Sequence, residues 1–258
     1  MENNAIILEG AISVLGALDF DSTRIKKIII KQGAINKTAR KVLAGAKAKK
    51  VETEFFSHDE MQKFAASYPL GKTHGGIFAL VTKREYLSPQ DLLVSHPKTI
   101  AVIEGIEDPY NLGYAARALY TQGTDALALP KRDFGASESL IEKASTGTFS
   151  KLPVAVFGVK SDLINLFKRE GYTIYCVDIK APEGSKIQVS DIFDVAFAEK
   201  TVFIIGGEKR GISKEFLRGA DEIVKIPYAK KFPHSLAAQT AATIVSYEIH
   251  RQRRGVQE

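Results

Sequence analysis

The residues best suited to form a chemical site lie near the carboxyl terminus, where an apolar run over residues 202–205 breaks at a glycine pair beginning with Gly206. The carboxylate of Glu208 follows the pair. A second apolar run, residues 223–226, stops at Pro227 and continues into a polar, basic loop. Apolar runs that end at glycine or proline are typical of buried strands that lead into ligand-facing turns. The pattern therefore predicts a ligand site at two strand ends.

Several common kinds of site are excluded by spacing. The separation of Gly206 and Gly211 matches a phosphate-cradling loop, but the lysine that such a loop requires is absent. No strand-like run is followed by the glycine pattern of a dinucleotide-binding turn. The five histidines show no metal-ligand spacing and no Ser-His-Asp arrangement emerges, so we expect them to be core or surface residues and predict no metal site.

Three segments carry a more specific signal. Residues 103–119 contain an Asn-x-Gly-x-x-x-Arg pattern that starts at Asn111 and ends at Arg117. GGEKRGIS starts at Gly206, and IPYAKKFPHSLAAQTAATIVSYE starts at Ile226. In this order, the three segments resemble the motifs of the SpoU (TrmH) family of RNA ribose 2′-O-methyltransferases, within the SPOUT class. Any one of the motifs alone would be a weak signal.

The resemblance implies transfer of a methyl group from S-adenosylmethionine to a ribose hydroxyl. Such a transfer needs oxygen, carbon and sulfur held in line, and a base that removes the hydroxyl proton. The resemblance gives the activation of the hydroxyl to Arg117. Because an arginine normally stays charged, two roles stay open for Arg117, a general base or a phosphate clamp. No metal is needed.

The resemblance also assigns the other site residues. Asn111 would orient the substrate or Arg117, with local turn hydrogen bonding as the simpler alternative. Glu208 would hold Asn111 or Arg117, or organise its loop through backbone amides, with a plain surface glutamate as the simpler alternative. Ser235 matches the serine of the third motif. The donor contacts are expected at strand ends and just after them, where a role in a turn or the core is the alternative. The family pattern gives Gly206, Ile226 and Leu236, and Val177, at the end of its strand, is expected to line the same pocket.

One position departs from the family pattern. Ala237 stands where the third motif expects asparagine, so the site loses an amide that donates and accepts hydrogen bonds. Either Gln239 or Asn111 supplies that amide, or the activity is reduced. The departure keeps a second hypothesis open, a relative that holds RNA and the donor without transferring a methyl group.

The elements that must position these residues alternate from residue 99 onward. Such alternation predicts an α/β domain, residues 99–258, with a parallel sheet, helices on both faces, and a ligand site at the carboxyl ends of the strands. The resemblance adds a trefoil knot at the C-terminal end. The expected strands are 100–104, 126–129, 154–157, 172–177, 202–205 and 223–226, and the expected helices are 109–120, 139–144, 161–169, 213–217 and a long one from His234-Ser235 to Arg254.

Residues 1–95 predict a smaller α/β domain, joined through a linker at about residues 84–98 that contains two prolines. The resemblance implies an L30e-like fold here, with His74-Gly75-Gly76 before its last strand. Six cations and no acidic residue occur between Lys37 and Lys50, on and beside an expected helix at 38–48. Such a run is either a solvated helix face or a surface for RNA.

Length and composition agree with a globular protein of two domains, since 258 residues are 45% hydrophobic and 26% charged. The net charge of +6 permits a polyanionic partner. The single Cys176 excludes an intramolecular disulfide and fits a reducing compartment. No apolar stretch approaches the ~20 residues that cross a membrane, and the N-terminus does not resemble a signal peptide.

These observations together predict a cytoplasmic enzyme that acts on structured RNA, with ribosomal RNA favoured over transfer RNA, and that binds neither DNA nor a membrane. The 2′-hydroxyl is the group that distinguishes RNA from DNA. The resemblance further implies a homodimer that buries part of the helix over residues 235–247.

Overall fold

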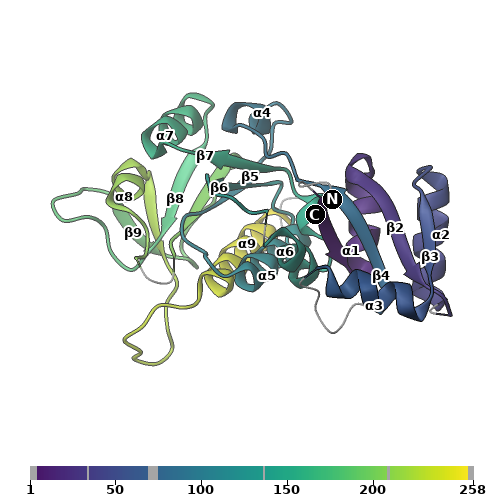
Figure 1. Cartoon of the computed structure of the whole chain (residues 1–258). Coiled ribbons are helices and arrows are strands. Elements are labelled where there is room, and N and C mark those ends of the chain that lie inside the picture. The colour runs from purple at the N-terminus through teal and green to yellow at the C-terminus, as the bar shows by residue number, and fades with distance from the viewer. Residues whose placement is uncertain (1–4, 34, 69–74, 136, 208–209, 255–258) are drawn as a thin grey trace. The chain divides into compact units, whose positions relative to one another are not determined.

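The computed structural model describes residues 5–33, 35–68, 75–135, 137–207 and 210–254. The chain forms two compact units (Figure 1). The first comprises Met1–Glu85 and Asp133–Lys151, and the second comprises Tyr86–Arg132 and Leu152–Glu258. The division after Glu85 falls inside the expected linker, whereas Asp133–Lys151 groups with the first unit although it connects two strands of the second.

The first unit contains a four-stranded sheet in the order β1-β4-β2-β3. Strands β2 and β3 are parallel, and β4 runs antiparallel to both β1 and β2. The elements are β1 Ala5–Glu9, α1 Ala11–Phe20, β2 Ile25–Lys31, α2 Lys37–Ala48, β3 Thr53–Phe56, α3 His58–Ala66, β4 Ile77–Thr82 and, from the later segment, α6 Glu138–Ser145. Strand β1 was not predicted from the sequence.

Both faces of this sheet are covered, because successive side chains of a strand point to opposite faces. Ile28 and Ile30 of β2 pack with side chains of α1 and α2, whereas Ile29 between them packs with Met61 of α3. Asn36 caps α2 by accepting hydrogen bonds from the amides of the first turn. The helix therefore buries Val42 and its neighbours and turns its lysines outward.

Helix α6 is held in the first unit by charged groups. Arg24 forms an ion pair with Glu138 and also donates to the carbonyl oxygen of Thr82 at 2.7 Å. Lys143 of α6 lies 3.2 Å from the carboxylate of Glu9 at the end of β1. The sequence predicted a helix at 139–144 as one of the helices covering the parallel sheet, and this placement is wrong because α6 packs with the other sheet.

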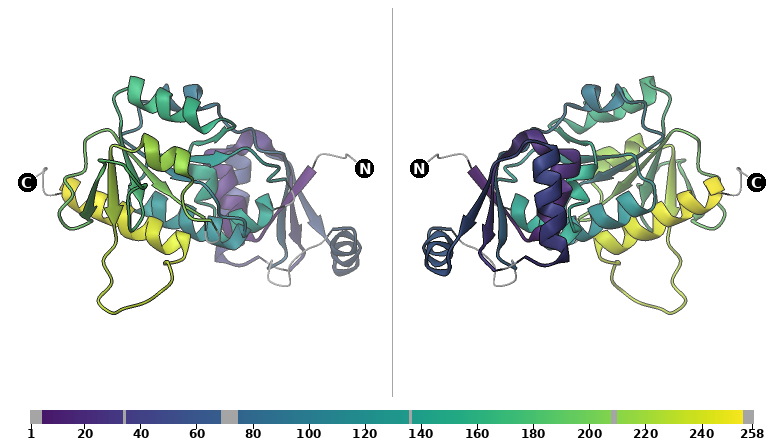
Figure 2. Two further views of the ribbon diagram at one scale, coloured as in Figure 1. Left: turned by 90° about the vertical axis from the view of Figure 1, so that its left-hand side faces the viewer. Right: turned by 90° about the vertical axis from the view of Figure 1, so that its right-hand side faces the viewer.

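The second unit contains a seven-stranded sheet, entirely parallel, in the order β7-β6-β5-β10-β8-β11-β9. Helices α4, α7 and α8 cover one face, and α5 and α9 cover the other (Figures 1 and 2). The elements are α4 Pro89–Leu93, β5 Thr99–Ile103, α5 Pro109–Thr121, β6 Ala126–Pro130, β7 Val154–Phe157, α7 Lys160–Arg169, β8 Thr173–Val177, β9 Gln188–Asp191, β10 Thr201–Ile205, α8 Lys214–Gly219, β11 Glu222–Lys225 and α9 Ala238–Arg254.

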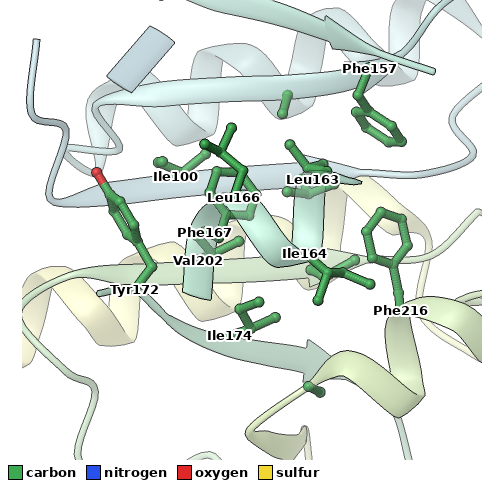
Figure 3. Close-up of a cluster of buried hydrophobic side chains, with 14 of the residues drawn as sticks. Ile100, Phe157, Leu163, Ile164, Leu166, Phe167, Tyr172, Ile174, Val202 and Phe216 are labelled. Atoms are coloured by element: carbon green, nitrogen blue, oxygen red, sulfur yellow. The ribbon is translucent and has the colours of Figure 1, made fainter. Parts of the chain in front are cut away.

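The core of this unit lies between the sheet and helices α4, α7 and α8 (Figure 3). Phe167 of α7 and Phe216 of α8 are fully buried against strand residues such as Ile174 and Val202. Every residue of β5 and β10 is buried, as expected for the central strands of a parallel sheet covered on both sides. The two strands whose tips carry the predicted motifs are thus rigidly supported.

The predicted α/β class and the parallel sheet are confirmed, and the remaining differences are local. The last helix begins at Ala238 and not at His234-Ser235, because the chain up to Ala237 stays in a non-helical loop. Strand β9 and helix α4 were not predicted. The knot stays a prediction, and His74 of the expected His-Gly-Gly turn lies outside the described residues. Within those residues, no helix is long and apolar enough to span a membrane.

Candidate active site

The site is built around glycines at the tips of β5 and β10. A Cβ atom on Gly206 would lie 2.2 Å from the carbonyl carbon of Gly211, and a Cβ on Gly207 would lie 2.6 Å from the carbonyl oxygen of Gly105. No side chain fits at such distances. Gly207 and Gly211 also exchange two backbone hydrogen bonds, of 3.2 and 3.0 Å, which close the loop between them. Glycine is therefore required here so that three backbone segments can approach one another.

A cavity of about 270 Å³ lies beyond the carboxyl ends of β8, β10 and β11. This is where a parallel α/β sheet is expected to bind its ligand. All four predicted donor-binding residues and the third-motif serine contribute to its wall. They are Val177, Gly206, Ile226, Ser235 and Leu236, and they are joined there by Asp178, Ile179, Lys180, Gly207 and Tyr228.

One side of the cavity is formed by the rim loop, residues 226–237, which connects β11 to α9. The hydroxyl oxygen of Tyr228 accepts a hydrogen bond of 3.0 Å from the amide of Leu236, so the two arms of the loop are tied together. Ser235 is exposed and Leu236 is half-buried. This hydrogen bond holds both arms at the cavity wall, and residues 229–234 between them project from it.

Glu104 supports another part of the wall. This residue follows β5, accepts a hydrogen bond of 2.8 Å from the amide of Ser213, and forms an ion pair with Lys160. The amide of Ser213 lies at the start of α8, where a carboxylate is favoured by the unpaired backbone amides. Glu104 thereby fixes the chain immediately after Gly211 and Ile212, which line the cavity.

The first motif places its asparagine at the start of α5. Asp108 is the N-cap of this helix and accepts a 2.9 Å hydrogen bond from the amide of Asn111, and Pro109 occupies the first turn. The side-chain oxygen of Asn111 accepts a hydrogen bond of 3.3 Å from the side chain of Gln239 on α9. The two residues that could replace the amide missing at Ala237 are therefore in contact.

The thiol of the single cysteine is unreactive. Cys176 is fully buried in β8, and burial, with smaller contributions from the neighbouring acidic groups, raises the pKa of its thiol far above the ordinary value. A buried neutral thiol is a poor nucleophile. The part of the chain that the structure describes also contains no group of three His, Cys, Asp or Glu side chains that could hold a metal ion.

Comparison with known proteins agrees with this geometry. The SpoU rRNA Methylase family matches residues 98–247, and the RNA 2′-O ribose methyltransferase substrate-binding family matches residues 7–87. The chain belongs to the SpoU rRNA methylase family. A Staphylococcus epidermidis protein assigned to the TrmH family of tRNA/rRNA methyltransferases is 29% identical over 239 residues, which cover 91% of each chain. A counterpart from Staphylococcus haemolyticus is 27% identical over 256 residues and covers 97% of each chain.

Solved SpoU structures share the fold. The methyltransferase AviRb from Streptomyces viridochromogenes, crystallised with AdoMet, has a TM-score of 0.77 at 19% identity, covering 98% of this chain and 92% of its own. An AdoMet-bound rRNA methyltransferase from Sinorhizobium meliloti has a TM-score of 0.75 at 20% identity, covering 97% and 88%. The resemblance seen in the sequence motifs and the predicted fold class are therefore confirmed.

The remaining predicted residues of this SpoU protein are not all at the cavity. Arg117 lies on the exposed face of α5, beside Tyr110 and Tyr114 at helical spacing, and its guanidinium has no hydrogen bond or ion pair within the described residues. Neither Arg117 nor Asn111 is part of the described cavity wall. Glu208 lies outside the described residues.

Three polar residues that this SpoU protein uses to build the cavity were missed from its sequence. Asp178 and Glu104 each follow directly after an apolar strand, the same signal that singled out Glu208, and Tyr228 follows Pro227 at the end of β11. A search for polar residues directly after every expected strand would have found Asp178, whereas Glu104 falls inside the expected strand 100–104 and Tyr228 is separated from its strand by Pro227.

Proposed function

We propose that this SpoU protein is an S-adenosylmethionine-dependent RNA methyltransferase that methylates a ribose 2′-hydroxyl in structured RNA, with ribosomal RNA tested before transfer RNA. One observation carries the proposal. Gly206, Ile226 and Leu236 were singled out for donor binding from motifs and Val177 from its place at a strand end, and these residues from three separated segments meet in one cavity.

The cavity suits the donor. Val177, Ile205, Ile226 and Leu236 offer apolar surface for a flat adenine ring, while Asp178 offers a carboxylate that can accept hydrogen bonds from ribose hydroxyls. The glycine contacts allow backbone amides and carbonyls to reach the ligand directly. S-adenosylmethionine supplies, when bound, an electrophilic methyl group on a sulfonium.

The chain's own residues would handle the hydroxyl. We assign Arg117 to the target nucleotide, either removing the hydroxyl proton or clamping a neighbouring phosphate; its guanidinium is exposed and has no partner among the described residues, which suits both roles. Asn111, held by Gln239, would orient that nucleotide. Glu208 and Ser235 keep the supporting roles that the family motifs imply.

RNA binding falls mainly to the first unit in this proposal. Its substrate-binding family match spans residues 7–87, and the exposed side of α2 carries cations without an ion pair within the described residues. Each cation that neutralises a phosphate releases counterions, so such a face favours a polyanion. The cations are Lys37, Arg40, Lys41 and Lys47, followed by Lys49 and Lys50.

We also propose a homodimer that acts in the cytoplasm. Tyr247 of α9 is 57% exposed, and Tyr114 of the adjoining α5 is 51% exposed. Large exposed aromatic side chains on packed neighbouring helices favour a protein–protein contact. Arg117 shares its helix face with Tyr114, so the proposed contact would lie close to the catalytic residue.

The test combines donor binding with methyl transfer. Calorimetry with S-adenosylmethionine should show binding by the wild-type protein and by Arg117→Ala, whereas radiolabelled transfer to total RNA should be lost only in Arg117→Ala. Arg218→Ala is the matched control, because this exposed arginine of α8 also lacks an ion pair within the described residues. Ribose-methylation mapping in cells with and without the gene would then identify the nucleotide. Absence of donor binding by the wild-type protein would refute the proposal.

The second candidate is a relative that binds RNA and the donor without catalysis, and Ala237 is the observation that favours it. Ala237 is exposed immediately before α9, so a longer side chain can be accommodated there. Donor binding without methyl incorporation by the wild-type protein would support this candidate. In that case Ala237→Asn, which restores the motif amide, should produce transfer activity.

A further inference from the structure

The middle of the rim loop projects from the second unit. In both views of Figure 2 and in Figure 1 the yellow-green segment before α9 extends away from the sheet as an open loop. Its two arms are fixed at the cavity, because Ile226 and Tyr228 of one arm and Ser235 and Leu236 of the other line the wall. Whatever the projecting part contacts therefore lies next to the cavity mouth.

The tip of the loop presents an aromatic pair. Phe232 is 60% exposed, and its ring lies 5.4 Å from the ring of His234 with an angle of 72° between their planes. Single exposed apolar side chains are common on protein surfaces. Here the exposed ring of Phe232 packs against a second ring and belongs to the loop whose arms line the cavity. An isolated apolar residue on a protein surface would not be expected to combine these two features.

The charged side chains next to the pair in the sequence are all positive. Lys230 and Lys231 are exposed, precede Phe232 directly, and form no ion pair within the described residues. No acidic residue occurs between Glu222 and Glu248. The surface thus combines an accessible aromatic face with cations on neighbouring positions of the chain.

We infer that this loop binds an unpaired stretch of the RNA substrate, with a base stacked on the Phe232–His234 pair and flanking phosphates on Lys230 and Lys231. The inference rests on the proposed function and adds to it the recognition of a single-stranded segment beside the methylated nucleotide. Aromatic side chains with interleaved cations are how proteins hold single strands, since every base offers a stacking face and every linkage a charge.

The favoured occupant is RNA and not a second protein chain because of the charge. A second copy of this chain would bring the same lysines and no carboxylate on its own rim loop, so the two loops would repel. The phosphates of a single strand match the cations, and they explain why two lysines adjoin an exposed ring.

The test uses the full-length protein and two hairpin RNAs, one carrying 2-aminopurine in its unpaired loop and one carrying it in its stem. Stacking on an aromatic ring quenches 2-aminopurine fluorescence, so the wild-type protein should quench the loop probe, whereas the stem probe, already quenched by the neighbouring bases, should not change. Phe232→Ala should abolish the quenching and weaken binding of the loop probe about tenfold. Phe232→Tyr should preserve both, whereas Phe232→Leu, which is apolar but not flat, should behave as Phe232→Ala.

Two further variants complete the design. Lys231→Ala should lower the slope of log affinity against log salt by about 0.7, because one phosphate contact is lost. Phe193→Ala removes another exposed phenylalanine, 75% accessible and not among the residues of the cavity wall, and should change nothing. Donor affinity should be the same in all of these variants, which shows that the cavity is intact.

The outcomes separate this inference from the proposed function. Wild-type protein that binds S-adenosylmethionine and methylates RNA, together with a Phe232→Ala variant of unchanged quenching and RNA affinity, would overturn the inference alone. A Phe232→Ala variant that becomes monomeric in sedimentation, with RNA affinity unchanged, would likewise overturn it and assign the ring to a second copy. Wild-type protein without donor binding would instead remove the proposed function on which the inference rests.

Discussion

Replacing Gly206 with alanine should disable the donor site by steric means alone. The new Cβ would lie 2.2 Å from the carbonyl carbon of Gly211 and 2.5 Å from the amide nitrogen of Ile212, where ordinary contact begins at 3.4 Å. Both atoms belong to the backbone, so no side chain can rotate away. The segment around Gly211, which lines the cavity, has to move by roughly 1 Å, and a displacement of this size can lower catalysis on the order of 100-fold.

The measurements are donor affinity by calorimetry and kcat/KM for transfer to RNA, with circular dichroism and thermal melting as checks on folding. We expect Gly206→Ala to fold and to lose most of its donor affinity and transfer. Gly158→Ala is the matched control, because a Cβ there meets nothing within 4 Å. A Gly206→Ala protein with wild-type affinity for S-adenosylmethionine would show that the close backbone approach is not needed for the cavity, and the reasoning would fail.

Three further predictions concern single side chains. Glu104→Ala should weaken donor binding roughly tenfold in calorimetry, since loss of a partly buried charge-assisted hydrogen bond to Ser213 costs about 1.5–3 kcal/mol and frees the cavity wall. Unchanged affinity would contradict this. Burial raises the pKa of Glu142 from 4.5 to about 7, against the hydrogen bond from Ser150 and the charge of Arg84, so folding takes up a proton and stability falls as pH rises through that window. Glu142→Gln should therefore unfold in denaturant with less pH dependence than wild type, and an identical slope would refute the assignment. Cys176 should resist thiol reagents until the protein is denatured, because its thiol is buried and its pKa is raised; rapid labelling of the native protein would disagree.

Much of the fold could be predicted because its signals are local. The buried strands β5 and β10 are continuous apolar runs, and Asp108-Pro109 is a helix start that depends only on neighbouring residues. The cavity could be predicted for the same reason, since Gly206 and Ile226 mark strand ends and strand ends of a parallel sheet converge.

The features that could not be predicted depend on residues far apart in the chain. Gln239 and Asn111 are 128 positions apart, and Ser213 and Glu104 are 109 apart, so no local pattern indicates that they touch. Strand β9 has an exposed and half-exposed burial pattern and lacks the apolar run that identified the central strands. Arg117 was recognised by its motif, but its place relative to the cavity depends on how α5 is rotated about its axis.

The helix that the sequence places between β6 and β7 has a consequence for biosynthesis. The ribosome releases β1 to β4 first, and chains tend to fold from the N-terminus as they emerge. Here the partners of Arg24 and Glu9 are on α6, which is translated only after β5, α5 and β6. The first unit therefore lacks the ion pairs of Arg24 with Glu138 and of Glu9 with Lys143 until part of the second unit has left the exit tunnel. The two units therefore complete their folding together during translation. Because each unit consists of two segments of the chain, neither can be replaced by joining two genes at a single position.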